Sequence, residues 1–155
     1  MNAAIEEDMS LLNSMNQDLG TATARILLVD DFEPFRELVS LLLQNEVGFE
    51  IVAEASDGLE GVRKARESKP DLVVLDMDLP FLNGIEVARQ IRLFSPDSTI
   101  LFLSGNNDSE LVREALKTGA HGYVLKFDAV DDLLDAAKAV LSGKRFVSRR
   151  LESDM

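Results

Sequence analysis

An acidic pair, a further aspartate, a serine and a lysine each stand at the end of a short apolar run in this sequence. Asp30 and Asp31 follow the first run, and Asp76 follows the third. Ser104 and Lys126 follow the fourth and fifth runs. A carboxylate can bind a hard cation or attack phosphorus, while a hydroxyl group and an ammonium group can bind phosphoryl oxygens. If these side chains meet in the fold, they have the residue types needed to form an aspartyl phosphate.

Taken one at a time, these residues have plainer explanations. Asp30, Asp31 or Asp76 could cap the helix that follows it. Ser104 precedes a glycine and could be an ordinary loop residue, and Lys126 could point into water. The combination is more specific than any of its members, because it requires four strands to end at the same edge of one sheet.

The apolar runs have the composition of strands in a parallel sheet. Each is short and nearly continuous, and each is followed by turn residues and a longer stretch with helical periodicity. The five predicted strands cover residues 25–29, 49–54, 71–75, 98–103 and 121–125. Helix starts are indicated by Pro34, by Asp57 with Glu60 and by Asn83 with Glu86. The pattern predicts one α/β domain built from five βα units.

The length of the chain agrees with a single domain. It has 155 residues, of which 46% are hydrophobic, enough for one core. We expect the domain at residues 25–141. An acidic extension that could form a short helix precedes it at residues 1–24, and a tail or truncated linker follows at residues 142–155.

Charge and composition argue against several classes of protein. Lys plus Arg total 16 against 28 Asp plus Glu, a net charge of −12, so direct nucleic-acid binding is not expected. The chain has no cysteine, which removes disulfides and thiolate metal sites. A secretory leader and a long apolar run are both missing from the sequence. We therefore expect a cytoplasmic protein that does not engage a membrane.

Adjacent first and third strands would crowd three carboxylates into one pocket. Strands in a sheet lie about 4.8 Å apart, and two like charges at about 4 Å repel by roughly 4 kcal/mol at an effective dielectric constant near 20. This is large against a net domain stability on the order of 10 kcal/mol. Either a protonated carboxylate or a bound cation could relieve the repulsion, and the all-oxygen ligand set favours Mg²⁺.

In their order and spacing, the motifs resemble the receiver domain of two-component response regulators. The matching segments are Leu28–Asp31, Val73–Pro80, Asn83–Gly84, Leu103–Gly105, Gly119–Ala120 and Tyr123–Lys126. The resemblance implies a doubly wound (βα)5 sandwich, flavodoxin-like or CheY-like, with a five-stranded parallel sheet of order 2-1-3-4-5. It also implies a switch that is phosphorylated by a sensor histidine kinase, a phosphotransfer protein or a small phosphodonor. Such a switch changes conformation to control an output protein, and a phosphorylation-dependent homodimer is one form that this control could take.

The resemblance assigns the metal site and the phosphorylated residue. Asp76 would be phosphorylated and would also bind Mg²⁺. Asp31 would bind the ion directly, and Asp30 would bind it through water. The backbone carbonyl of Asp78 would complete the ligands that the protein supplies.

The remaining roles concern the phosphoryl group and the switch. By resemblance, Ser104 and Lys126 would bind the phosphoryl group, and Tyr123 would turn inward when Ser104 moves. We expect the side chain of Asp78 to lie across the pocket from Asn106. Its negative charge would there slow phosphorylation by small anionic donors.

Two departures from the family pattern stand out. Phe127 follows Lys126 where many receivers have a proline in a cis bond, and a non-proline cis bond costs about 3 kcal/mol. Residues 125–129 and 143–148 resemble receivers that precede a LuxR-type helix-turn-helix domain, which is not part of this sequence. The expectation is either a truncated chain or a protein that works without that domain.

A phosphatase is the alternative interpretation. Residues 73–78 also resemble the nucleophile motif of haloacid-dehalogenase-type phosphatases, which would use Asp76 and Asp78 with a later acidic pair such as Asp131 and Asp132. This interpretation leaves the acidic pair after the first strand unexplained, and the later pair opens a helical stretch. The main prediction is therefore a signalling switch. We expect it to catalyse only its own phosphorylation and slow dephosphorylation, and not to act as an enzyme on other substrates.

Overall fold

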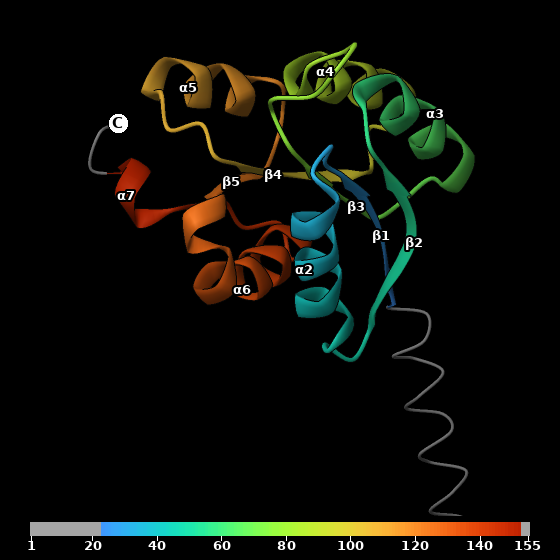
Figure 1. Cartoon of the computed structure of the whole chain (residues 1–155), viewed down its shortest axis with the longest axis horizontal. Helices are drawn as coiled ribbons and strands as arrows, with labels where there is room; N and C mark the ends of the chain where they lie inside the picture. The colour runs from blue at the N-terminus through green and yellow to red at the C-terminus, as the bar shows by residue number, and fades with distance from the viewer. Residues whose placement is uncertain (1–22, 153–155) are drawn as a thin grey trace, which may run out of the picture.

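The computed structural model describes residues 23–152, which form a parallel sheet between two layers of helices (Figure 1). The strands are β1 (Ala24–Val29), β2 (Phe49–Ala55), β3 (Leu72–Leu75), β4 (Thr99–Ser104), β5 (Gly122–Leu125) and β6 (Phe146–Val147). The helices are α2 (Glu33–Gln44), α3 (Gly58–Ser68), α4 (Gly84–Phe94), α5 (Ser109–Lys117), α6 (Ala129–Leu141) and α7 (Arg149–Glu152), with a 3₁₀ turn η1 (Lys126–Asp128). Figure 1 shows α2 and α6 on one face of the sheet and α3, α4 and α5 on the other.

The strand order places the expected site residues side by side. The order is β2-β1-β3-β4-β5-β6, which contains the predicted order of the first five strands. Leu28 pairs with Val74 and Val29 with Leu75, all in parallel register. Asp30 and Asp76 therefore leave the sheet from neighbouring strands at the same edge.

Each face of the sheet has its own apolar core because side chains alternate along a strand. Val73 and Leu75 of β3 point into a cluster with α3, α4 and α5. Leu72 and Val74 point into a second cluster with α2 and α6. The four central strands are buried almost throughout, which makes the sheet a rigid base for the residues at its edge.

Local sequence signals set the helix starts as predicted. Asp57 accepts a hydrogen bond from the backbone N–H of Glu60 at 2.8 Å, and Asn83 accepts one from Glu86 at 3.0 Å. Pro34 lies in the first turn of α2, where a missing N–H carries no cost. Among the described helices, none is long and apolar enough to cross a membrane.

The expected five-stranded sheet has a sixth strand. The segment expected as a tail or linker continues past α6 as β6, which pairs in parallel with β5, and as α7. β6 has only two residues between basic side chains, too few for a periodic pattern to show in the sequence. At the other end, β1 begins at Ala24, and the expected helix of the N-terminal extension falls on residues 1–22, outside the described part of the chain.

Candidate functional site

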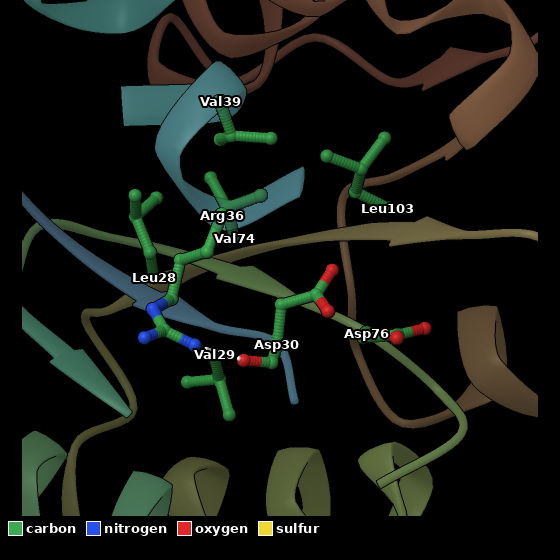
Figure 2. A pocket seen from close by; sticks show the side chains of 8 residues that line it. All are labelled: Leu28, Val29, Asp30, Arg36, Val39, Val74, Asp76 and Leu103. Atoms are coloured by element: carbon green, nitrogen blue, oxygen red, sulfur yellow. Dashed lines mark hydrogen bonds between the residues drawn. The ribbon is translucent and has the colours of Figure 1, made fainter. Parts of the chain in front are cut away.

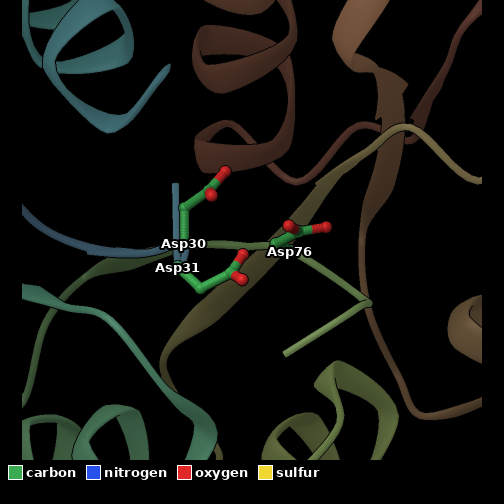
Figure 3. Close-up of side chains that lie close together, drawn as sticks. All are labelled: Asp30, Asp31 and Asp76. Carbon is green, nitrogen blue, oxygen red and sulfur yellow. The ribbon is translucent and has the colours of Figure 1, made fainter. Parts of the chain in front are cut away.

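Three carboxylates converge beyond the carboxyl ends of β1 and β3. Oxygen atoms of Asp30, Asp31 and Asp76 all lie within 4.8 Å of one another, and Figure 3 shows the three side chains gathered at this edge. Asp30 and Asp76 are 6% and 5% exposed, whereas Asp31 is exposed to solvent. The arrangement follows directly from the pairing of β1 with β3.

The backbone around Asp30 is held by side chains of the first loop and of α2. The carboxylate of Asp30 accepts a hydrogen bond from the N–H of Phe32 at 2.8 Å. Nη1 of Arg36 donates to the carbonyl oxygen of Asp30 at 2.7 Å (Figure 2). Nε of Arg36 donates to Glu54 at 3.0 Å. Phe32, with no side-chain hydrogen bond, occupies the N-cap of α2, so Asp30 and Asp31 are not the helix cap.

Lys126 lies between the two buried carboxylates. Its Nζ is 2.7 Å from Oδ2 of Asp30 and 3.0 Å from Oδ2 of Asp76. The same nitrogen lies 4.7 Å from the centre of the Phe35 ring, a cation–π contact. One ammonium group therefore offsets part of the repulsion that the sequence predicted among the carboxylates, so the protein itself supplies a cation at this site.

Burial and the ion pair together shift the pKa values of Asp76 and Lys126. Burial raises the pKa of Asp76 above its usual range, although Lys126 opposes the rise. Burial acts to lower the pKa of Lys126, but the hydrogen bonds to Asp30 and Asp76 outweigh it and hold the pKa above its usual value. Lys126 therefore stays charged at neutral pH, which its predicted role in binding phosphoryl oxygens requires.

A small cavity lies beneath the carboxylates. It is lined by Asp30, Arg36 and Asp76 together with apolar side chains of the central strands and α2, and Figure 2 shows these residues around it. Its volume of about 10 Å³ is at the lower limit for a cavity that holds one water molecule. Little space is therefore left next to Asp30 and Asp76 on this side of the sheet.

Ser104 and Tyr123 are joined through the loop after β4. Ser104 is fully buried, and its hydroxyl accepts a hydrogen bond from the N–H of Asn106 at 3.2 Å. Tyr123 is also fully buried and donates its hydroxyl hydrogen to the carbonyl oxygen of Asn106 at 2.7 Å. Any movement of this loop therefore changes the surroundings of both side chains.

Asp78 lies on the solvent side of the site. Its side chain is exposed, and its N–H is 3.4 Å from Oδ1 of Asp76. Burial raises the pKa of Tyr123 to about 12, and the carboxylates of Asp78 and Asp76 contribute to the rise. The charge of Asp78 therefore affects a buried group of the site. That the side chain of Asp78 lies across the pocket from Asn106 stays a prediction.

The donor set fits Mg²⁺. Three carboxylates and nearby backbone carbonyls are hard oxygen ligands, and one side of the cluster faces solvent, which leaves room for the waters that Mg²⁺ keeps. Within the described residues, this is the one group of three or more carboxylate or imidazole ligands that come together in this way.

Comparison with known proteins shows which family this chain resembles. The chain matches the family model of the response regulator receiver domain over residues 26–138. The chain belongs to this family. As a receiver, it is a signalling switch and not a conventional enzyme.

The relatives include transcriptional regulators and response regulators. The chain is 34% identical over 141 residues to the transcriptional regulatory protein DegU of Brevibacillus brevis, covering 91% of this chain and 60% of the relative. It is 38% identical over 128 residues to the nitrate/nitrite response regulator protein NarL of Escherichia coli, covering 83% of this chain and 59% of the relative. A crystal structure of a LuxR-family two-component response regulator from Aurantimonas sp. SI85-9A1 superposes with a TM-score of 0.81 at 39% identity, over 84% of this chain and 94% of that one. The chain thus spans about 60% of the length of these curated relatives.

The family assignment excludes the phosphatase interpretation. The relatives are response regulators. The acidic pair that this interpretation needed, Asp131 and Asp132, lies in the first turn of α6 and not at the end of a strand.

Every peptide bond among the described residues is trans, so the bond between Lys126 and Phe127 does not have the cis geometry of receivers with proline.

Three contacts of the site were not predicted from the sequence. Phe35 and Arg36, in the first turn of α2, hold Lys126 and the backbone of Asp30 respectively. These two residues follow Asp30 by only five and six positions, and this short separation is the one feature of the sequence from which their contacts could have been predicted. Ser148, which bonds to β5 next to Lys126, carries no such signal, because it belongs to a segment with no strand pattern.

Proposed function

We propose that Asp76 is the residue that accepts a phosphoryl group in this receiver. The observation that carries the proposal is the joint placement of Asp30, Asp31 and Asp76 with Lys126 at one edge of the sheet. A carboxylate oxygen of Asp76 attacks the phosphorus of the donor. The new O–P bond forms as the bond to the leaving group breaks, and the electron pair of that bond departs with the leaving group.

The other side chains support this step. Asp31, Asp76 and the backbone carbonyl of Asp78, with Asp30 through water, would hold Mg²⁺, which would supply positive charge against the incoming phosphoryl oxygens. Lys126 exchanges its contact with Asp76 for one with a phosphoryl oxygen. Ser104 moves to donate a hydrogen bond to another oxygen. These roles agree with the burial and hydrogen bonding of each residue.

The proposed partners follow from the chemistry of the reaction. The donor is a phosphohistidine on a sensor kinase or phosphotransfer protein, or a small phosphodonor. An output protein reads the conformation of Ser104 and Tyr123, and slow hydrolysis of the aspartyl phosphate returns the receiver to its resting state. We place this exchange in the cytoplasm, in keeping with the family.

Labelling with acetyl phosphate tests the proposal. We expect a phosphorylated chain only when Mg²⁺ is present, and none in the Asp76→Asn variant. Asp97→Asn, an exposed position in the loop before β4, is the matched control and should label normally. Persistent labelling of Asp76→Asn would show that another residue accepts the phosphoryl group.

A further inference from the structure

The chain after α6 folds back onto the edge of the strand that leads to Lys126. Residues 146–152, which we call the C-terminal strap, comprise β6, Ser148 and α7. Gly122 pairs with Phe146 and Tyr123 with Val147, and the N–H of Ser148 donates to the carbonyl oxygen of Tyr123 at 3.0 Å. The strap therefore covers the outer edge of β5, the strand that holds the predicted switch residue.

Ser148 continues this attachment with its side chain. It is fully buried, and its hydroxyl accepts a hydrogen bond from the N–H of Leu125 at 3.0 Å. Leu125 is the residue directly before Lys126. A buried N–H without a partner is costly, so this hydrogen bond fixes the backbone from which Lys126 extends.

The rest of the strap contacts the turn on the far side of Lys126. Nε of Arg150 lies 3.1 Å from the carboxylate of Asp128, and its guanidinium lies 4.6 Å from the centre of the Phe127 ring. Leu151 is 2% exposed and belongs to the same buried cluster as Tyr123. The strap thus holds the chain on both sides of Lys126 and packs into the core that contains Tyr123.

From these contacts we propose that Ser148 is a positioning residue for Lys126, and that the C-terminal strap is coupled to phosphorylation. The proposal rests on the function assigned to Asp76. In this structure the strap is attached while Tyr123 is fully buried. Because the strap pairs with the backbone of Tyr123 here, the proposed coupling favours the form with Tyr123 inward, the position that the family resemblance assigns to the phosphorylated receiver.

Coupling of this kind is reciprocal. If attachment of the strap favours the phosphorylated form, phosphorylation must tighten the strap by the same factor. The segment that continues from α6 is thereby the part of the chain that senses the state of Lys126. Whatever follows the strap in a longer chain would be held or released with it.

The first test uses Ser148→Ala in the full chain. Binding of beryllofluoride with Mg²⁺, followed by ¹⁹F NMR, should weaken by about threefold or more, because the variant loses the coupling between the strap and the phosphorylated form. The chain has one tyrosine and no tryptophan, so its intrinsic fluorescence reports Tyr123 alone and should shift in the variant. Ser142→Ala is the matched control, because that hydroxyl donates only to the carbonyl oxygen of Ala139 within the end of α6.

A second measurement needs no variant. Amide exchange of Ser148 in the unmodified chain should slow by about threefold or more when beryllofluoride and Mg²⁺ are added. Arg150→Gln, which weakens the surface contacts of the strap and leaves its buried residues in place, should reduce that change. These two measurements decide the question if Ser148→Ala does not fold.

The outcomes separate the two proposals. Tight binding of beryllofluoride with unchanged exchange at Ser148 would overturn the coupling and leave Asp76 as the phosphorylation site. A lower melting temperature of Ser148→Ala, with unchanged affinity for beryllofluoride and unchanged tyrosine fluorescence, would make Ser148 merely structural. Absence of Mg²⁺-dependent binding in the unmodified chain would overturn both.

Discussion

The ammonium nitrogen of Lys126 lies 3.0 Å from Oδ2 of Asp76, the carboxylate that we propose as the phosphoryl acceptor. The same nitrogen is 2.7 Å from Asp30, so a single lysine is shared by two buried acids. Lys126 therefore offsets part of the charge of the acidic cluster, and Mg²⁺ bound at the proposed site would offset more of it.

This sharing predicts a stability defect that Mg²⁺ repairs. In Lys126→Met the two buried carboxylates lose their cation, and removal of one partner from a buried ion pair costs on the order of 3 kcal/mol. Thermal unfolding should show a lower midpoint in EDTA and a larger rise on addition of Mg²⁺ than in the unmodified chain. Lys117→Met, at an exposed position of α5, is the control. An equal response to Mg²⁺ in both chains would contradict the shared role.

The Phe35 ring predicts an effect on labelling. Phe35→Leu removes the cation–π contact with Lys126 and keeps an apolar side chain of similar reach. A cation–π contact is worth about 0.5–2 kcal/mol, so labelling by acetyl phosphate should slow by a few-fold, while Phe35→Tyr should keep the normal rate. Equal rates in the two variants would show that the ring only fills space.

Asp78 should oppose small anionic donors. Its carboxylate is exposed beside Asp76, and removing one like charge at about 6 Å in a water-like dielectric gains roughly 0.7 kcal/mol. Asp78→Asn should therefore label a few-fold faster with acetyl phosphate, and the gain should shrink as salt rises. The comparison is with Asp97→Asn over a range of ionic strengths. A slower or unchanged rate at low salt would rule out this role for the charge.

Gly84 should tolerate no side chain. A Cβ placed there would lie 2.2 Å from the carbonyl oxygen of Asp76, whereas a Cβ at Gly105 meets no atom within 4 Å. Gly84→Ala should lose on the order of 2 kcal/mol of unfolding free energy and label more slowly, because the loop that carries Asp76 must shift. Gly105→Ala should stay within about 0.5 kcal/mol of the unmodified chain in denaturant titrations. Similar stabilities of the two variants would be inconsistent with the packing.

The phenol of Tyr123 should ionise at a higher pH than a tyrosine in solvent. Burial raises its pKa from 10.0 to about 12, so the neutral form is favoured in the folded state. The resulting stabilisation is fully present below pH 10 and is lost as the pH rises through about 12. Absorbance of the single tyrosine, followed together with circular dichroism, gives this value directly. Ionisation near pH 10 with an intact dichroism spectrum would place Tyr123 in solvent.

The sequence was enough to predict the sheet order and the acidic cluster. Strand-end polar residues are a local signal, and the family resemblance supplied the adjacency of β1 and β3 that brings Asp30 and Asp76 together. Capping residues such as Asp57 and Asn83 also act within a few residues of one another, so their role is visible without tertiary structure.

The contacts that position Lys126 could not be predicted in the same way. Phe35 and Lys126 are 91 positions apart in the sequence, and their contact depends on how α2 packs against β1, β2 and α6. β6 gains its strand conformation from pairing with β5, since two residues have too little intrinsic preference to show in the sequence. Tertiary packing, and not local propensity, determines both features.

The short sixth strand also bears on solubility. Without β6, the edge of the sheet would be β5, four buried residues with an unpaired row of backbone groups, which is a template for aggregation. With β6, the edge is two residues long and is flanked by the basic side chains of Lys144, Arg145, Arg149 and Arg150. Positive charges repel a second copy of the same edge, so β6 makes this edge of the sheet a poorer template for pairing than β5 would be.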